Sequence, residues 1–227
     1  GAIAELLLAQ RTDIEIVAWV SAVGNIESPM PDIATLSRDD VDATPMRCPD
    51  GETSKRMQQR VIETKDDSDS IGGVVSCVCR NVPAGLGEPV FDKIEALLAQ
   101  AMLSIPATKG FEIGSGFGGT RMRGSQHNDP FVRKDSRLGT ITNHSGGVQG
   151  GISNGEPILL RVAFKPPATI GQEQATVDFE GNDTVLAARG RHDPCVVNRA
   201  VPVVESMAAL VLADCWLQQK AVAAHRL

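Results

Sequence analysis

The chain has 227 residues, 42% hydrophobic and 22% charged, which is the composition of a globular protein with one large domain or two small ones. Asp and Glu (28) outnumber Lys and Arg (22), and this net charge of -6 argues against a nucleic-acid partner. Aromatic residues are scarce at 4%, without any Tyr, so a surface that stacks bases is not expected either. The apolar run around residues 210–213 is shorter than a bilayer span, and we expect no contact with a membrane.

The cysteine pattern predicts reduced thiols rather than a disulfide framework. Two of the five alternate on a predicted strand and so point to the same face, but no second pair completes a zinc site. We therefore expect no metal, and a reducing compartment such as the cytoplasm, although an organelle fits as well. The five residues are Cys48, Cys77, Cys79, Cys195 and Cys215.

The first third of the chain predicts a helix, two strands and a long polar segment. Residues 1–10 have helical spacing with neither an initiator Met nor a capping residue ahead of them, so we expect further sequence upstream. Residues 13–23 and 73–82 alternate and are rich in β-branched side chains, which is typical of strands. Residues 28–70 are polar and punctuated by prolines. We interpret them as a surface excursion with a short helix over residues 55–65.

A further helix is predicted from Asp92 to Pro106. Asp92 can cap it, with Glu95 three residues on as the capping-box partner, and Pro106 ends it. Its apolar residues recur at helical spacing and predict a buried stripe. The stripe consists of Ile94, Leu97, Leu98, Ala101, Met102 and Ile105.

A short strand over residues 109–113 leads into Gly114-Ser-Gly-Phe-Gly-Gly119, which has the GxGxxG spacing of a dinucleotide site. That fingerprint needs a helix directly afterwards, whose N-terminus holds the pyrophosphate. Here residues 120–130 contain glycine, asparagine and proline and predict a loop. We therefore interpret the match as incidental.

Residues 121–141 predict a charged loop that ends at a second glycine cluster, residues 143–155, with two Gly-Gly pairs. Glycines let the backbone approach a ligand closely, and successive N–H groups can hold an anion. A structural Ω-loop explains the same composition. The cluster alone does not separate these two hypotheses.

Residues 156–165 predict a strand that delivers a Lys-Pro-Pro turn. Pro166 and Pro167 fix the backbone around Lys165 and Thr169, and a held Lys with a hydroxyl suits a phosphate. A hairpin follows, with strands over residues 174–180 and 184–188.

The loop of residues 190–195 places His192 between two charged neighbours, Arg191 and Asp193. We expect a helix after it, with Pro202 in its first turn and a nearly continuous apolar stretch over residues 204–217. A charged loop at the start of a buried helix can serve chemistry or can be an ion-paired turn. Because Lys165, Arg189, Arg191 and Arg199 fall in these segments of an acidic chain, we expect a small polyanionic ligand.

Three long stretches resemble chorismate synthase: residues 81–92, 143–155 and 190–205. Gly1-Ala-Ile-Ala4 is similar to the end of that family's central helix. The resemblance covers nearly the whole chain and is weak only in residues 28–70 and 121–141.

The resemblance implies an α+β fold of the β-α-β sandwich type, with residues 1–227 as one partial domain and residues 28–70 as a variable surface insertion. It implies a homotetramer that uses reduced FMN, with NADPH as reductant in bifunctional members. The implied reaction is the anti-1,4-elimination of phosphate from 5-enolpyruvylshikimate 3-phosphate to give chorismate. This is a carbon–oxygen lyase step of the shikimate pathway, which leads to the aromatic amino acids.

Carried over by position, one residue is catalytic: Asp193 matches the family's acid near flavin N5, which is thought to assist proton transfer. Such a role is chemically reasonable for a positioned carboxylate. His192 is expected in the pocket but not as a base, and His127, His144 and His225 as solvated or structural. The family's FMN contacts fall on Pro106, Ala107, Gly151, Lys165, Pro166, Pro167, Ala168, Thr169 and Arg191.

Two departures from the family pattern bear on function. Many bacterial members have Asn-Ala where this chain has Pro106-Ala107, so a side-chain contact from that Asn is lost. The family's two catalytic histidines, its arginine-rich substrate loop and its Arg-Ser-Ser flavin motif would lie upstream of Gly1. The chain is therefore expected to be part of an enzyme. The alternative is a non-catalytic module that binds flavin or a full-length paralogue, and a Rossmann dehydrogenase is a third, disfavoured hypothesis.

Overall fold

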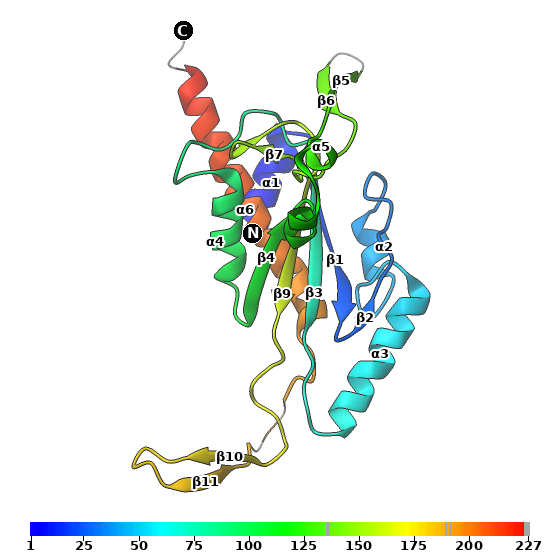
Figure 1. Ribbon diagram of the computed structural model, residues 1–227, viewed down its shortest axis with the longest axis vertical. Helices are drawn as coiled ribbons and strands as arrows, with labels where there is room; N and C mark the ends of the chain where they lie inside the picture. The colour runs from blue at the N-terminus through cyan, green and yellow to red at the C-terminus, as the bar shows by residue number, and fades with distance from the viewer. Residues whose placement is uncertain (135–136, 189, 191, 225–227) are drawn as a thin grey trace.

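A computed structural model describes residues 1–134, 137–188, 190 and 192–224. Its centre is a five-stranded antiparallel sheet in the order β2-β1-β3-β9-β4 (Figure 1). Helices lie against this sheet, so the α+β class predicted from the sequence is confirmed. The strands are β1 (Glu15–Val23), β2 (Ile26–Glu27), β3 (Gly73–Arg80), β4 (Thr108–Ile113) and β9 (Ile158–Phe164).

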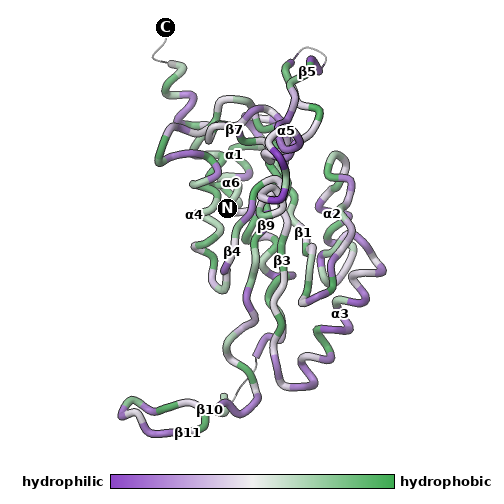
Figure 2. Tube along the Cα trace, in the orientation of Figure 1, coloured by the Kyte–Doolittle hydropathy of each residue, from purple (hydrophilic) through white to green (hydrophobic). Residues whose placement is uncertain are grey.

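Three helices form a layer with the core beneath it: α1 (Ala2–Arg11), α4 (Ile94–Leu103) and α6 (Val197–Ala224). The longest, α6, packs on β1 and β3 and lies between α1 and α4. The odd-numbered residues of β3 face it, because a Cβ added at Gly73 would lie 3.2 Å from Val197. Cys77 on that face is fully buried and pairs in register with Leu160 of β9. Figure 2 shows the same distribution, with the apolar residues concentrated in β1, β3 and the helix layer.

The segment of residues 28–70 is packed into the fold, contrary to the expected surface excursion. It forms α2 (Arg38–Asp42) and α3 (Gly51–Asp66), which lie against β1 and β2. The sequence did not indicate this packing, because the apolar residues of the segment are isolated among polar ones. They come into contact with the rest of the core only in the folded protein. The buried apolar side chains are Leu36, Val41, Met46, Cys48 and Met57.

Two predicted helix starts were wrong. Asp92 does not cap α4, because its backbone closes a turn with Glu88 and Pro89 and the helix begins two residues later. The helix α6 begins at Val197, so Pro202 lies in its second turn. Proline there leaves the carbonyl of Asn198 without its helical donor. Arg47 Nη1 donates to that carbonyl instead, at 2.9 Å.

Residues 121–141 contain regular structure where a loop was expected. After the 3₁₀ helix η1 (Gly116–Arg121) and the short α5 (Gly124–His127), the strands β5 (Phe131–Lys134) and β6 (Arg137–Thr140) form a hairpin. The GxGxxG run directly follows the edge strand β4, which is antiparallel to β9, and its last four residues form the first part of this 3₁₀ helix. That is not the strand–turn–helix context of a dinucleotide site.

Two further hairpins complete the described chain. The strands β7 (Val148–Gln149) and β8 (Ile152–Ser153) form a very short one within the second glycine cluster. The strands β10 (Gln174–Val177) and β11 (Asp183–Leu186) form the predicted hairpin, which projects from the body as an arm (Figure 1).

The helix α6 extends on both sides of the apolar stretch of residues 204–217 that the sequence predicted for it. Its span Val197–Ala223 has the length and composition of a membrane-crossing helix, and half of its most apolar window is buried within the protein. A core helix passes the same test, and α6 contacts β1, β3, α1 and α4. Its buried apolar residues therefore serve the core of this fold, whereas Leu210 and Leu217 are 47% and 49% exposed.

Candidate functional site

The segments of three predicted site residues, Ala107, Lys165 and Asp193, meet at the end of the sheet where β9 ends and β4 begins. The backbone N–H of Lys165 donates to the carbonyl of Ala107 at 2.9 Å, which joins the two segments directly. Ala107 itself has φ +69°, a left-handed conformation unusual for a residue with a Cβ. The strands thus deliver Pro106-Ala107 and the Lys-Pro-Pro turn to one place.

Residues 70 and 71 connect this turn to the loop that carries Asp193. Ser70 Oγ donates to the carbonyl of Pro167 at 2.6 Å, and the next N–H, that of Ile71, donates to the carbonyl of Pro194 at 2.7 Å. Because both bonds come from consecutive residues, the turn and the Asp193 loop lie side by side. No sequence motif indicated this role of Ser70.

Asp193 is held by a residue that the sequence assigned only to a basic cluster. Arg199 Nη1 and Nη2 donate to the two carboxylate oxygens of Asp193, each at 2.8 Å. Arg199 lies in the first turn of α6, so the helix fixes the pair. His192 lies beside it with Nε2 3.3 Å from the carbonyl of Ala188. Arg191 and Arg189 lie outside the described residues.

The polar groups of the turn remain open to solvent. Lys165 Nζ reaches only the carbonyl of Pro166 within the described part of the chain, at 3.1 Å, and Ala168 and Thr169 are exposed. A cation and a hydroxyl on a fixed, accessible backbone can bind an anionic group. This end of the molecule therefore fits a small phosphate-bearing ligand.

Gly151 does not join this group within one chain. It has φ +88° and its carbonyl accepts the N–H of Ile94, at the opposite end of α4. The strand β9, between the two ends, is about 20 Å long at ~3.3 Å per residue. The prediction that Gly151 lies with Lys165 and Asp193 is not met inside a single copy.

The second glycine cluster is a structural loop. Asn143 bonds the loop to itself, because its Nδ2 donates to the carbonyl of Pro157 and its Oδ1 accepts the N–H of Gly147. The carboxylate of Asp129 accepts the N–H groups of His144 and Ser145, at 2.8 and 2.9 Å. These N–H groups are thus already satisfied, and the Ω-loop hypothesis describes the cluster better than the anion cradle.

Hydrogen bonds keep the carboxylate of Asp129 ionised. Burial alone would raise its pKa, but the bonds from Ser145, Thr142 and His144 outweigh burial and lower the pKa to about 2. Nearby, Ser115 Oγ lies 2.8 Å from Nε2 of His127, whose ring is 5.7 Å from that of His144. Both histidines are partly buried and tie loops together, which agrees with the structural role expected for them.

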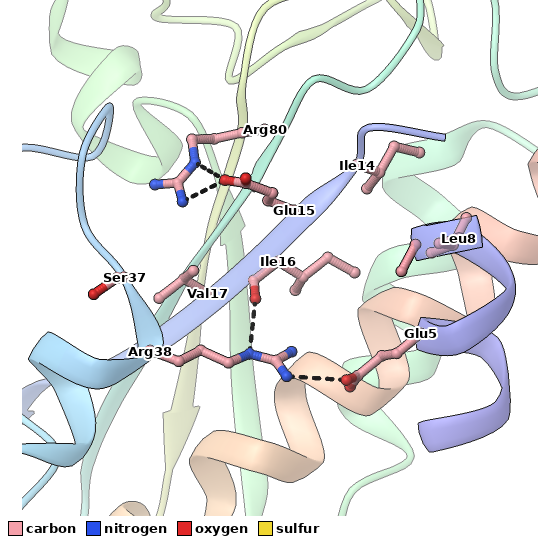
Figure 3. A pocket seen from close by; sticks show the side chains of 10 residues that line it. Glu5, Leu8, Ile14, Glu15, Ile16, Val17, Ser37, Arg38 and Arg80 are labelled. Carbon is pink, nitrogen blue, oxygen red and sulfur yellow. Dashed lines mark hydrogen bonds and ion pairs between the residues drawn. The ribbon is translucent and has the colours of Figure 1, made fainter. Parts of the chain in front are cut away.

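A cavity of about 330 Å³ lies away from these residues, between α1, β1 and α2 (Figure 3). Arg38 crosses it, with Nη1 3.0 Å from Glu5 and Nη2 3.3 Å from the buried Glu205. Burial raises the pKa of Glu205, while the N–H of Ala18 and the charge of Arg38 oppose that rise. The sequence analysis did not single out Glu205. The available signal was a single acidic residue within an otherwise apolar stretch of the helix.

Comparison with known proteins now decides the family. The family model described as chorismate synthase matches residues 1–217. This chain belongs to the chorismate synthase family. It is 61% identical to the chorismate synthase of Opitutus terrae, over 97% of this chain and 61% of that protein. It is 51% identical to that of Schizosaccharomyces pombe, over 100% of this chain and 65% of that protein.

A solved structure of chorismate synthase has the same fold. It superposes with a TM-score of 0.80 at 30% sequence identity, over 96% of this chain and 61% of that chain. The chain thus spans about 61% of the length of several of the chorismate synthases it matches. The chain therefore has the α+β fold of the family.

Proposed function

We propose that this chain forms the flavin-binding end of a chorismate synthase. The complete protein would eliminate phosphate from 5-enolpyruvylshikimate 3-phosphate in the anti-1,4 sense and release chorismate, as a lyase of the shikimate pathway. One observation carries the proposal: Ala107, Lys165 and Asp193, from three distant segments, converge at one end of the sheet. Membership of the family supports the same reaction.

The residues at this end fit the chemistry of FMN. The Lys165 ammonium would neutralise the flavin phosphate, and Thr169 would donate a hydroxyl to it. Pro166 and Pro167 restrict the backbone beneath, and the bond from Ser70 fixes its position. Reduced FMN supplies the electron density that assists the loss of phosphate. Arg191, outside the described residues, is proposed as a further contact.

Asp193 would hold and relay a proton beside the flavin. Its two oxygens accept from Arg199, and each oxygen retains a further lone pair for a proton. Because the guanidinium binds both oxygens in parallel, the carboxylate is fixed in direction. Proton transfer by a positioned side chain typically contributes 10²–10⁴-fold to a rate.

The remaining expectations stay proposals. We propose that the complete protein is a cytoplasmic homotetramer, and that NADPH serves only if it reduces its own flavin. Under the second hypothesis the protein is a non-catalytic module, which would bind FMN at the same site but would not catalyse the elimination. It predicts FMN binding without phosphate release at any protein concentration.

The test compares Asp193→Asn with the unchanged protein, both in the complete natural chain with reduced FMN. We expect phosphate release to fall by about 100-fold or more, because the relay is lost. The dissociation constant of FMN, measured by fluorescence quenching, should change little because Asn keeps the shape of Asp. Asp66→Asn, an exposed acid on α3, is the matched control. Turnover that proceeds equally well without any flavin would refute the proposal.

A further inference from the structure

The cavity between α1, β1 and α2 has the size of a small-molecule site. Its volume of about 330 Å³ falls at the lower end of the roughly 300–1,000 Å³ that is typical of ligand pockets. An apolar cavity of about 150 Å³ already holds one benzene ring, so this cavity can hold a body of two rings. Its walls are mostly apolar, and the apolar lining residues are buried except for the second in chain order. They are Leu8, Ala9, Ile14, Ile16 and Val17.

The guanidinium group of Arg38 is already bonded to the protein. Its Nε donates to the carbonyl of Ile16 at 3.2 Å, and its Nη1 donates to Glu5 at 3.0 Å. Its Nη2 lies 3.3 Å from Glu205. All three nitrogens of the group therefore have an acceptor, and two of these acceptors are acids that neutralise its charge.

Arg80, the second arginine of the cavity, is bonded in the same way. Its Nη1 donates to the carbonyls of Ile33 and Leu36, at 2.9 and 2.8 Å. Its Nε and Nη2 both donate to one oxygen of Glu15, at 3.1 and 2.7 Å. Its side chain is only 13% exposed. Neither arginine therefore offers a free charge to an anionic ligand.

The polar atoms left for a ligand are carboxylate oxygens. Glu5 accepts only through Oε2, from Arg38. Glu15 accepts only through Oε2, from Arg80. Within the described residues, the Oε1 atoms of both acids thus have no hydrogen-bond donor. Figure 3 shows the two ion pairs at different places along the cavity, with Ile16 between them.

We propose that this cavity binds a small amphiphilic amine, whose apolar body fills the cavity and whose ammonium group donates to Glu5 or Glu15. An ammonium group has three donors and no acceptor, which matches the free carboxylate oxygens. Glu5 is the stronger partner, because its side chain is 27% exposed and that of Glu15 is 60% exposed, and solvent weakens an exposed ion pair. An anion would meet these carboxylates without a free cation to balance them.

The amine site lies at the opposite end of the sheet from the proposed flavin end. Glu15 pairs with Arg80 where β3 ends, whereas the bonds of residues 70 and 71 lie just before β3 begins. The eight residues of β3 between them are about 25 Å long at ~3.3 Å per residue. The amine site therefore goes beyond the proposed function, and a failure of the FMN proposal leaves the measurements below intact.

A pair of matched probes tests the charge of the ligand. Isothermal titration calorimetry on the complete natural chain, without flavin, compares naphthylmethylamine with naphthylacetate, which carries a carboxylate on the same rings. We expect one amine bound per chain, and binding of the acid that is weaker by about tenfold or more. Equal affinities for the two probes, or no binding of the amine at millimolar concentration, overturn the proposal.

A substitution at Glu5 tests the predicted ammonium contact. Glu5→Gln keeps the shape of the side chain and removes its charge, so it should weaken binding of naphthylmethylamine by about tenfold. It should leave the weak binding of naphthylacetate no weaker. Asp66→Asn, an exposed acid on α3, is the matched control and should change neither. Binding of the amine that is equally strong in Glu5→Gln and Asp66→Asn overturns the contact.

Filling the cavity tests its position. Ala9 lines the cavity and is exposed on α1, whereas its neighbour Gln10 is exposed on the same helix and does not line it. Ala9→Leu should weaken binding of the amine by at least about tenfold, because the added side chain occupies the cavity. Gln10→Leu adds the same side chain next to it and should leave binding unchanged. Leucine is a good helix former, so both variants should unfold at similar temperatures without ligand. Equal binding by the two variants overturns the proposal.

Discussion

Arg199 determines the direction of the Asp193 carboxylate more than the stability of the fold. The side chains of the two residues are 63% and 36% exposed, and exposed ion pairs contribute only about 0–1 kcal/mol. A bidentate geometry nevertheless excludes rotation of the carboxylate. Within the described residues, the helix α6 therefore orients the Asp193 carboxylate through Arg199.

Alanine substitutions at Gly150 and Gly151 should distinguish the cost of a left-handed backbone from the cost of steric crowding. Both have positive φ, but a Cβ at Gly151 would lie 2.4 Å from Cγ of Lys93, whereas nothing lies within 4 Å at Gly150. We expect Gly150→Ala to cost about 1–2 kcal/mol from the left-handed backbone alone. Gly151→Ala should cost about 3 kcal/mol or more, because overpacking is added. Urea unfolding of the two variants measures the difference, and equal values would contradict the crowding.

At the scale of elements, the long helix α6 tolerates a proline because another segment supplies the missing donor. Arg47 approaches from the segment between α2 and α3, and its Nε also bonds Asp42 at 2.9 Å. The carbonyl of Asn198 is thereby satisfied without a helical N–H. The segment of residues 28–70 is thus bonded to the start of α6 as well as packed on the sheet.

A double-mutant cycle tests this link. Arg47→Ala should destabilise the protein by about 1 kcal/mol, because the partly buried carbonyl of Asn198 loses its donor. In the Pro202→Ala background the helix supplies its own N–H, so the same substitution should cost less. The interaction free energy from urea unfolding of the four proteins is the readout. Additive effects would show that Arg47 does not replace the helical bond.

Helices and strands whose apolar residues recur regularly were predictable from the sequence. Those that depend on contacts with residues far away in the chain were not. The strands β1, β3 and β9 and the helix α4 were recognised because their apolar residues recur regularly. The hairpin β5–β6 was missed because its exposed faces carry no such period. The start of α6 was placed late, since the bond from Arg47 that permits Pro202 inside a helix comes from about 150 residues away in the chain.

At the scale of the whole molecule, the candidate site divides between the two ends of the sheet. Family motifs identified Ala107, Lys165 and Asp193, and the fold brings them together. The motifs could not show that Gly151 lies at the other end, because a motif contains no distances. If Gly151 contacts a flavin held at Lys165, a second copy must provide it.

The stability of the molecule should depend on pH through Asp129. Its pKa is lowered from 3.8 to about 2 in the fold, so its contribution is complete above pH 4 and is lost as the pH falls toward 2. We expect a loss of about 1–2 kcal/mol across this range that Asp129→Asn removes. Urea unfolding at pH 5, 4 and 3 measures it, with Asp66→Asn as the control for charge. An unchanged slope in Asp129→Asn would contradict the assignment.

Arg38 and Glu205, beside the cavity, also protect the outer edge of strand β1 from pairing with other chains. Strand β1 pairs with β2 only at its end, which would leave its outer backbone free to recruit a foreign strand. Instead Arg38 Nε donates to the carbonyl of Ile16, and Glu205 accepts the N–H of Ala18. The N–H of Val20 donates to the carbonyl of Arg47. Side chains and a loop thus cap the outer edge of this strand, which prevents the sheet from growing there into an aggregate.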